Sequence, residues 1–268
     1  MAILSVLKRQ SKALLAAIAA LFILVPAAYA MRVSPMVVEM ESNGSNTVAR
    51  VEVQNINAGK LAFQTRVFRM EIDKDGKITE TPARRQIPCL PAAGRAAPGG
   101  RQVIRLQWVG EPEIPTSQAY YVSVEQLPVP FEPGSKDAAS AQVQVLYTMR
   151  ALVVVICRRG AKPDVKPASV HQVNYQPPAL PGATEQPPLQ DGVAITLRND
   201  GRRHAMMSNF AWHLEGTDRD GKFLRVDVSP EDLSRVVGTG YVPAQGERTF
   251  NLPVPGFGPG PIKLTFAK

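Results

Sequence analysis

The side chains that most often carry catalysis are few in this sequence and do not stand in known catalytic spacings. Its three histidines are His171, His204 and His213, and none has the HExxH spacing or another paired spacing typical of a metal site. The sequence has no G-x-S-x-G nucleophile elbow, no Walker A loop and no G-x-G-x-x-G dinucleotide loop. We therefore expect no enzyme, no metal site and no cofactor.

Two acidic segments superficially resemble calcium-binding loops. They are residues 73–76 (Asp-Lys-Asp-Gly) and 218–221 (Asp-Arg-Asp-Gly). A calcium loop of the helix–loop–helix type needs more acidic ligands and a terminal Glu. Both segments lie between strand-like patterns, and Asp-Gly is a strong hairpin signal. We interpret both as hairpin turns.

Cys89 and Cys157 are the two cysteines of the chain, too few for a disulfide framework or a four-thiolate zinc site. In an oxidising compartment they could form one disulfide, which would close a loop of about 68 residues and stabilise the fold by roughly 4 kcal/mol. The alternative is two separate thiols, one buried beside Val155 and Ile156. Both possibilities stay open, because the sequence does not show whether the two Cβ atoms meet.

The first 30 residues have the pattern of an export signal. A positively charged segment precedes an apolar run over 13–25, and Ala28-Tyr29-Ala30 fits an A-x-A cleavage pattern. The alternative is a membrane anchor, but a spanning helix needs roughly 20 apolar residues. Residues 13–30 give 18 with a proline inside. We expect cleavage after about Ala30 and an exported chain that does not insert into the membrane.

Composition favours a folded, strand-rich protein. Hydrophobic residues make up 44% and charged residues 20% of the chain, which is typical of globular proteins. The 24 prolines and 20 glycines disfavour a helical bundle. Without the first 30 residues, 28 basic and 23 acidic residues leave a net charge of +5. That mild excess is weak support for a nucleic-acid partner, which we do not expect.

Alternation of apolar and polar residues indicates half-buried antiparallel strands. It appears in residues 50–53, 61–67, 104–108 and 120–125 and continues in the second half of the chain. Short strands separated by turns predict an all-β protein of two immunoglobulin-like β-sandwich domains. We place the domains at 31–160 and 168–268, joined by a linker over 161–167, and expect an extended proline-rich loop over 176–190.

The most informative segment is residues 141–156, AQVQVLYTMRALVVVI. Its first half alternates, with Val143, Val145, Tyr147 and Met149 on one face, and residues 152–156 are apolar on both faces. A long strand at an exposed sheet edge is an aggregation hazard, and one use for such an edge is to pair with another chain. The alternative is an ordinary central strand of the first sandwich.

Several segments resemble the periplasmic chaperones that assemble pili and fimbriae by the chaperone–usher route. Their order and spacing, with the export signal, make the resemblance specific over nearly the whole mature chain. The matching segments are 35–40 (PMVVEM), 51–55 (VEVQN, with a closing Asn), 98–106 (PGGRQVIRL), 120–130 (YYVSVEQLPVP) and 196–201 (TLRNDG).

The resemblance implies two immunoglobulin-like domains at an angle and a location in the periplasm. It also implies donor-strand complementation, in which the last strand of the first domain lends alternating apolar side chains to an incomplete pilin subunit. By position, the donated row would be Val143, Val145, Tyr147 and Met149. The implied partners are pilin subunits and an outer-membrane usher, and the free protein could cap its own edge by self-association.

The family also anchors the subunit's terminal carboxylate with two basic residues, one on the donor strand and one on the first strand. Arg150 is the candidate on the donor strand, since its guanidinium fork fits a carboxylate. The alternative is that Arg150 makes an internal ion pair or reaches solvent. For the first strand the nearest basic residue is Arg32, which lies outside the best-matching segment and departs from the family pattern.

Two other classes of function compete with a chaperone. An immunoglobulin-like adhesin or structural surface module would share the fold but would need neither a long donor strand nor a free cleft. A secreted enzyme or binding protein on a β-sandwich would need a convergent polar site, which the sequence does not reveal.

Overall fold

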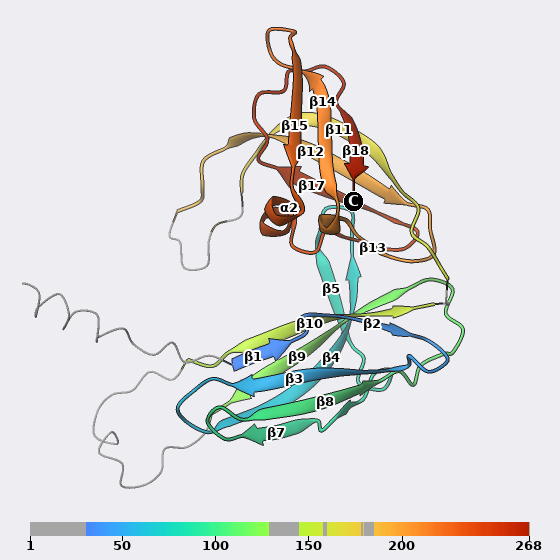
Figure 1. Ribbon diagram of the computed structural model, residues 1–268, viewed down its shortest axis with the longest axis vertical. Helices are drawn as coiled ribbons and strands as arrows, with labels where there is room; N and C mark the ends of the chain where they lie inside the picture. Colours follow the sequence, from blue (N-terminus) through green and yellow to red (C-terminus); the bar gives the residue numbers. More distant parts are fainter. Residues whose placement is uncertain (1–30, 129–144, 158–159, 178, 180–184, 268) are drawn as a thin grey trace, which may run out of the picture.

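The computed structural model describes residues 31–128, 145–157, 160–177, 179 and 185–267. These residues form two stacked units that consist mainly of β-strands (Figure 1). The prediction of an all-β fold is confirmed. The predicted export signal, residues 1–30, and its cleavage site lie outside the described residues. No helix among the described residues is long and apolar enough to cross a membrane.

The first unit is a sandwich of two sheets. Its strands are β1 Met31–Ser34, β2 Val37–Glu41, β3 Val48–Asn55, β4 Leu61–Ile72, β5 Ile78–Pro82, β6 Cys89–Leu90, β7 Ala93–Ala96, β8 Arg101–Gln107, β9 Gln118–Leu127 and β10 Thr148–Ile156. One sheet has the order β1-β3-β8-β6, and the other has the order β2-β10-β9-β4-β5, with β7 paired to β4.

Alternating side chains of both sheets fill the core between them. Val51 of β3 lies directly opposite Ile104 of β8 in the ladder. Both are fully buried, as are Val53 of β3 and Leu106 of β8. Tyr120, in β9, is buried among them from the opposite sheet. The period of two in the sequence thus corresponds to one face in the core and one face outside, as expected for antiparallel strands.

The second unit is smaller, and its described residues include one short α-helix and one 3-10 turn. Its strands are β11 Val165–Tyr175, β12 Gln190–Asn199, β13 Ala205–Met206, β14 Ala211–Thr217, β15 Phe223–Val228, β16 Tyr241–Val242, β17 Gly246–Leu252 and β18 Lys263–Ala267; η2 spans Met207–Asn209 and α2 spans Pro230–Val237. The main sheets are β11-β12-β17 and β15-β14-β18. Trp212 is fully buried between them and meets Phe250 and Phe266 edge to face, which gives this unit its own core.

Both acidic segments are hairpin turns. Residues 73–76 join β4 to β5, and 218–221 join β14 to β15. In each turn the first Asp accepts backbone hydrogen bonds from residues two and four positions later. Gly76 and Gly221 have φ values of +92° and +82°, a conformation that glycine adopts at little cost. Among the described residues, no cluster of three or more His, Cys, Asp or Glu side chains is placed to hold a metal ion.

The connection between the two units is short. After β10 ends at Ile156, β11 begins at Val165, inside the segment 161–167 that we predicted as a linker. β11 then ends at Tyr175 and β12 begins at Gln190, so the proline-rich segment lies between these two strands.

The two cysteines are free and buried, so the possible disulfide is not present. The sulfur of Cys89 lies 3.9 Å from the carbonyl oxygen of Ile87, whereas the sulfur of Cys157 lies 3.4 Å from the carbonyl oxygen of Arg202 in the second unit. The two thiols therefore occupy different surroundings. Burial raises the pKa of Cys89 to about 11, which keeps this thiol protonated and unreactive.

A buried asparagine closes a strand in each unit. Asn55 at the end of β3 donates to the carbonyl oxygens of Gly59, Ala96 and Ala97 at 2.8–3.1 Å and accepts from the backbone of Asn57. These bonds satisfy backbone groups where the chain leaves the sheet.

Asn199 plays the same part at the end of β12. Its Nδ2 donates to the carbonyl oxygens of Arg203 and Pro243, and its Oδ1 accepts from the backbone N–H groups of Asp164 and Gly201, at 2.8–3.1 Å. The side chain is fully buried. One residue therefore ties together the start of β11, the end of β12 and the loop before β17.

We expect Asn199→Ala to lower the free energy of unfolding by about 3 kcal/mol, because several part-buried backbone groups lose their partners at once. Urea unfolding followed by tryptophan fluorescence measures this change. Asn46→Ala is the matched control, since Asn46 is exposed and its side chain makes no hydrogen bond among the described residues. Equal stability of the two variants would contradict the role assigned to Asn199.

Candidate functional site

The first strand of the chain changes sheets and thereby leaves an edge open. β1 pairs with β3 in one sheet, and after Pro35 and Met36 the chain continues as β2, which runs parallel to β10 in the other sheet. Proline has no N–H to give to a ladder and occurs at such breaks. The pairing of β2 with β10 begins only at Leu152, whose N–H donates to the carbonyl oxygen of Met36.

The start of β10 is therefore paired on one side only. Residues 148–151 pair with β9, and among the described residues no strand forms a ladder with their other side. Leu152–Ile156 pair with both β9 and β2. The predicted 16-residue donor strand is thus only partly available: its apolar second half is an ordinary central strand, and the open edge is confined to the residues before Leu152.

The residues just before β10 expose apolar side chains. Val145, Leu146 and Tyr147 are 58%, 46% and 38% exposed. The carbonyl oxygen of Tyr147 accepts a hydrogen bond from the N–H of Gln126 at 2.9 Å, so the main chain still follows β9. Val143, the first residue of the predicted row, lies outside the described residues. We define residues 145–151 as the donor segment.

Odd-numbered residues of β10 face the first core. Met149 is half-buried and packs against that core, in line with Val153 and Val155 further along the strand. Val145 and Tyr147 have the same parity, and side chains two residues apart lie on one face of an extended chain. By this parity, Val145 and Tyr147 extend the inward-facing row of β10 beyond Met149, the outermost residue of that row that packs against the core.

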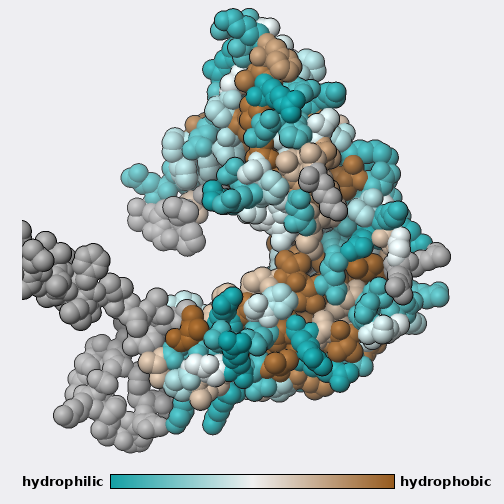
Figure 2. Space-filling view, viewed as in Figure 1, coloured by the Kyte–Doolittle hydropathy of each residue, from teal (hydrophilic) through white to brown (hydrophobic). Residues whose placement is uncertain are grey.

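Even-numbered residues of β10 face the second unit. Leu152 and Val154 pack with Met70, Ala119 and Tyr241 in a small apolar cluster between the units. In the space-filling view the surface is hollowed between the units, with hydrophobic surface at the base of the hollow (Figure 2). This hollow is the candidate cleft.

Arg150 stands at the cleft side of the open edge and makes an internal ion pair. Its Nη1 lies 2.5 Å from Oε1 of Glu80 on β5, and its guanidinium lies 5.8 Å from the ring centroid of Tyr121. Its side chain is 45% exposed. The internal pair is the alternative that the sequence left open, and the exposure leaves room for a second carboxylate.

The charges around Tyr121 define the electrostatics of the cleft. Burial raises the pKa of Tyr121, and the carboxylate of Glu80 acts in the same direction, while Arg150 and Arg248 act against them. Arg150 on β10 and Arg248 on β17 thus act on one tyrosine from opposite units. The phenol stays neutral and offers a hydrogen-bonding group near the two cations.

Arg32 lies elsewhere. It alternates with the buried Met31 and Val33 on β1, so its side chain is on the outer face of the first sheet. Arg150 is on the outer face of the other sheet, and the core separates the two. The structure does not bring together the two anchor candidates that the sequence suggested.

Polar contacts fix how the units meet. Glu39 on β2 lies 2.7 Å from Nη2 of Arg203 and 3.0 Å from Nε2 of His204, whose ring stacks on Tyr241. Further along, the β4–β5 hairpin extends from the first unit to the second (Figure 1), where the backbone carbonyl of Lys74 accepts from the N–H of Thr249 at 2.7 Å.

Sequence reasoning missed Glu39, Glu80 and Tyr121. Each occupies a strand position that reads as an ordinary outward-facing residue. The contacts of Glu80 and Glu39 depend on the path of the β4–β5 hairpin and on the packing of the two units, and no local pattern encodes either.

No protein-family model and no curated protein matches this sequence. Among solved structures, the chain is similar to the CsuC–CsuE chaperone–tip adhesion subunit complex of archaic chaperone–usher Csu pili of Acinetobacter baumannii, at 16% identity over 83% of this chain and 90% of that chain, with a TM-score of 0.46. It is also similar to the E. coli chaperone DraB (14% identity, 90% and 97% covered, TM-score 0.49) and to the class 5 fimbriae chaperone CfaA (10%, 89% and 99%, 0.49). These are distant similarities.

The contact of Glu39 with the second unit makes stability depend on pH. The hydrogen bond with His204, helped by Arg203, holds the pKa of Glu39 at about 2, well below its usual 4.5. At any pH above the pKa of Glu39 in the unfolded chain, about 4.5, the depressed pKa adds to the free energy of unfolding. This contribution is lost as the pH falls from 4.5 toward 2. We expect Glu39→Gln to flatten the loss of thermal stability over that range, measured as the unfolding midpoint against pH.

Glu41→Gln is the control, because Glu41 lies two residues along β2 and makes no ion pair among the described residues. If Glu39→Gln leaves the acid dependence as steep as Glu41→Gln does, Glu39 does not couple the units in this way.

Proposed function

We propose that this chain is a periplasmic chaperone that holds an incomplete pilin subunit along the donor segment, by donor-strand complementation, and delivers it to an outer-membrane usher. The observation that carries the proposal is the open edge of β10, where unpaired backbone continues into exposed apolar side chains. The resemblance of the sequence to chaperones of the chaperone–usher route is the second support.

An open edge with apolar side chains is unusual for a protein that works alone. Natural sheets protect their edges with charges, prolines, bulges or very short strands. Here the open edge has the exposed apolar side chains of Val145 and Tyr147 instead of such protection. These two residues have the same parity as the side chains of β10 that pack in the sandwich core. A partner that lacks one strand supplies what this edge lacks: a second ladder of hydrogen bonds and a groove for the row.

The donor segment has the length that a missing strand requires. Seven residues at 3.3–3.4 Å each span roughly 23 Å, close to the common length of strands in sandwiches. Burial of Val145 and Tyr147 would contribute on the order of 3–6 kcal/mol before the costs of association and ordering. The ladder itself adds hydrogen bonds that are otherwise made to water.

Arg150 is placed to hold a carboxylate of the bound subunit. It lies at the end of the donor segment, at the cleft, with Tyr121 beneath its guanidinium. Glu80 keeps it oriented, and a guanidinium fork has enough N–H donors to bind a second carboxylate. In this arrangement the apolar row sets the register in which the subunit pairs with the donor segment, and Arg150 holds the carboxylate of the subunit at the cleft end of that segment.

Replacing a residue of the row with Asp tests strand donation. We expect Val145→Asp and Tyr147→Asp each to abolish a 1:1 complex with a pilin-like subunit from the same genome, because a charge would enter the apolar groove of the subunit. Co-expression, affinity purification through a tag on the subunit and size-exclusion chromatography measure the complex, and circular dichroism checks the fold.

Leu146→Asp is the matched control. Leu146 is next to both residues and is 46% exposed, but it has the opposite parity. The proposal predicts a complex with this variant. Wild-type amounts of complex from both row variants, or equal loss from Leu146→Asp, would contradict it.

A second experiment separates the two roles of Arg150. We expect Arg150→Ala to weaken subunit capture at least tenfold while the unfolding midpoint changes little, because a half-exposed ion pair contributes only about 0–1 kcal/mol. Glu80→Ala removes the same internal pair but leaves the cation.

If Arg150 anchors a carboxylate, Glu80→Ala captures the subunit at least as well as the wild type. If Arg150 matters only through Glu80, both variants weaken capture equally. That second outcome would make Arg150 a structural residue.

A further inference from the structure

The outer face of the first sheet is rich in arginine. We call it the arginine face; its members lie on β1, β3 and β8 and alternate with buried core residues of the same strands. They are Arg32, Ser34, Arg50, Glu52, Gln54, Arg101, Val103 and Arg105.

Two of these arginines oppose each other directly. The register of β3 and β8 pairs Arg50 with Arg105, and both side chains are exposed. Side chains in directly opposite positions have Cβ atoms about 5 Å apart, and like charges there destabilise a sheet. The fold gains nothing from this pair.

The arginine face has little internal compensation. Among the described residues Arg32, Arg50 and Arg105 make no ion pair. Arg101 lies 3.4 Å from Glu52 and remains 62% exposed. Four guanidinium groups and one carboxylate leave a net charge of +3 on one face of one sheet, a large part of the net +5 expected for the mature chain.

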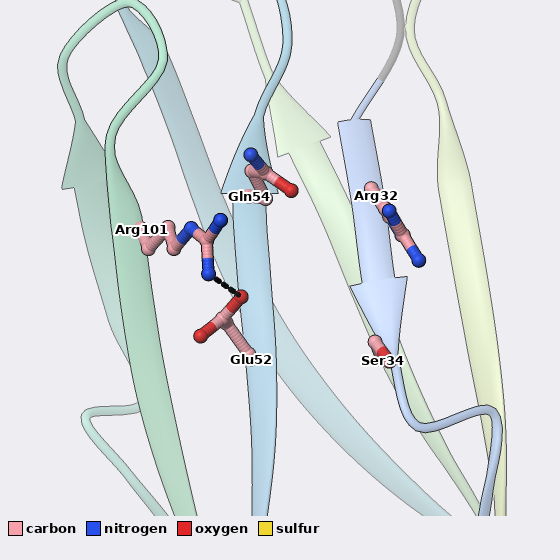
Figure 3. A pocket seen from close by; sticks show the side chains of 5 residues that line it. All are labelled: Arg32, Ser34, Glu52, Gln54 and Arg101. Carbon is pink, nitrogen blue, oxygen red and sulfur yellow. Dashed lines mark ion pairs between the residues drawn. The ribbon is translucent and has the colours of Figure 1, made fainter.

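The face also has a shallow hollow. Arg32, Ser34, Glu52, Gln54 and Arg101 line it, and Figure 3 shows Arg32 and Arg101 on either side of Gln54, on strands β1, β3 and β8. In register, Gln54 stands between the two cations, with Arg32 opposite it on one side and Arg101 on the other. An amide between two guanidiniums suits a ligand that accepts hydrogen bonds at several points.

We propose that the arginine face binds an acidic segment of a partner protein, at a site separate from the donor segment. All four cations are arginines, whose planar fork matches carboxylates, rather than the point charge of lysine. Val103, which lies between Arg101 and Arg105 on β8 and is 47% exposed, offers an apolar contact for a side chain of a bound peptide. Charge complementarity thus selects carboxylates spaced along a chain.

The arginine face and the donor segment lie on different sheets. The even-numbered side chains of the donor segment face the cleft, whereas the arginine face is the outer side of the first sheet. Arg50 and Arg105 lie on β3 and β8, which do not pair with β10, and the proposal therefore rests on these two residues for a contact separate from the donor segment.

The test uses a fluorescein-labelled ten-residue peptide in which Glu alternates with Ser, titrated in 50 mM salt and followed by fluorescence anisotropy. We expect the wild-type protein to bind, and Arg50→Glu or Arg105→Glu each to weaken binding at least tenfold. Each single change also replaces a like-charge pair with an opposite-charge pair, so the unfolding midpoint should rise. The double variant Arg50→Glu/Arg105→Glu should not bind, and its midpoint should return toward the wild-type value.

Arg95→Glu is the control. It makes the same change in net charge on β7, in the other sheet, and should leave binding within twofold. If the Arg95 variant loses as much affinity as the Arg105 variant, the binding is a net-charge effect and the proposal fails. It fails also if the wild type binds vesicles with 30% phosphatidylglycerol but not the peptide.

Discussion

The organisation of this protein follows from one constraint on β-sheets: every strand edge has to be paired, covered or used. The first strand cannot serve both sheets at once. As β1 it pairs with β3 at the edge of one sheet. After Pro35 it continues as β2, which pairs with β10 at the edge of the other sheet. The ladder of β10 is therefore complete from Leu152 and open before it. The candidate binding edge is a consequence of where the chain crosses, and not of a special sequence in β10 itself.

Side-chain parity then assigns each residue of β10 to one of two environments. Odd positions enter the core and run on into the exposed row, while even positions face the second unit. A register shift of one residue would exchange the two sets. The same rule places Arg150 beside Tyr121 and Glu80, and it puts Glu39 within reach of Arg203 and His204. One ladder thus positions the edge, the cleft and the contact between the units.

Structural features encoded by short-range sequence patterns could be predicted, whereas contacts between elements far apart in the sequence could not. Alternation gave the strands, Asp-Gly gave the two hairpin turns, and the resemblance pointed to the closing asparagines 55 and 199. The second half of the predicted strand, residues 152–156, is paired on both sides. The sequence could not show this, because an apolar run looks the same whether one or two neighbours pair with it. Arg32 was assigned to the cleft by nearness in sequence, but parity turns it to the opposite face.

The two outer faces of the first sandwich differ for a physical reason. The cleft face combines apolar residues with paired charges, which suits a partner that is desolvated on binding. The arginine face keeps its charges in water and leaves a like-charge pair uncompensated, which suits a contact that forms and breaks with ionic strength. A sandwich with two such faces can hold one partner firmly and meet another briefly. The proposed chaperone role would require this combination, because the bound subunit has to stay in place while a second protein recognises the complex.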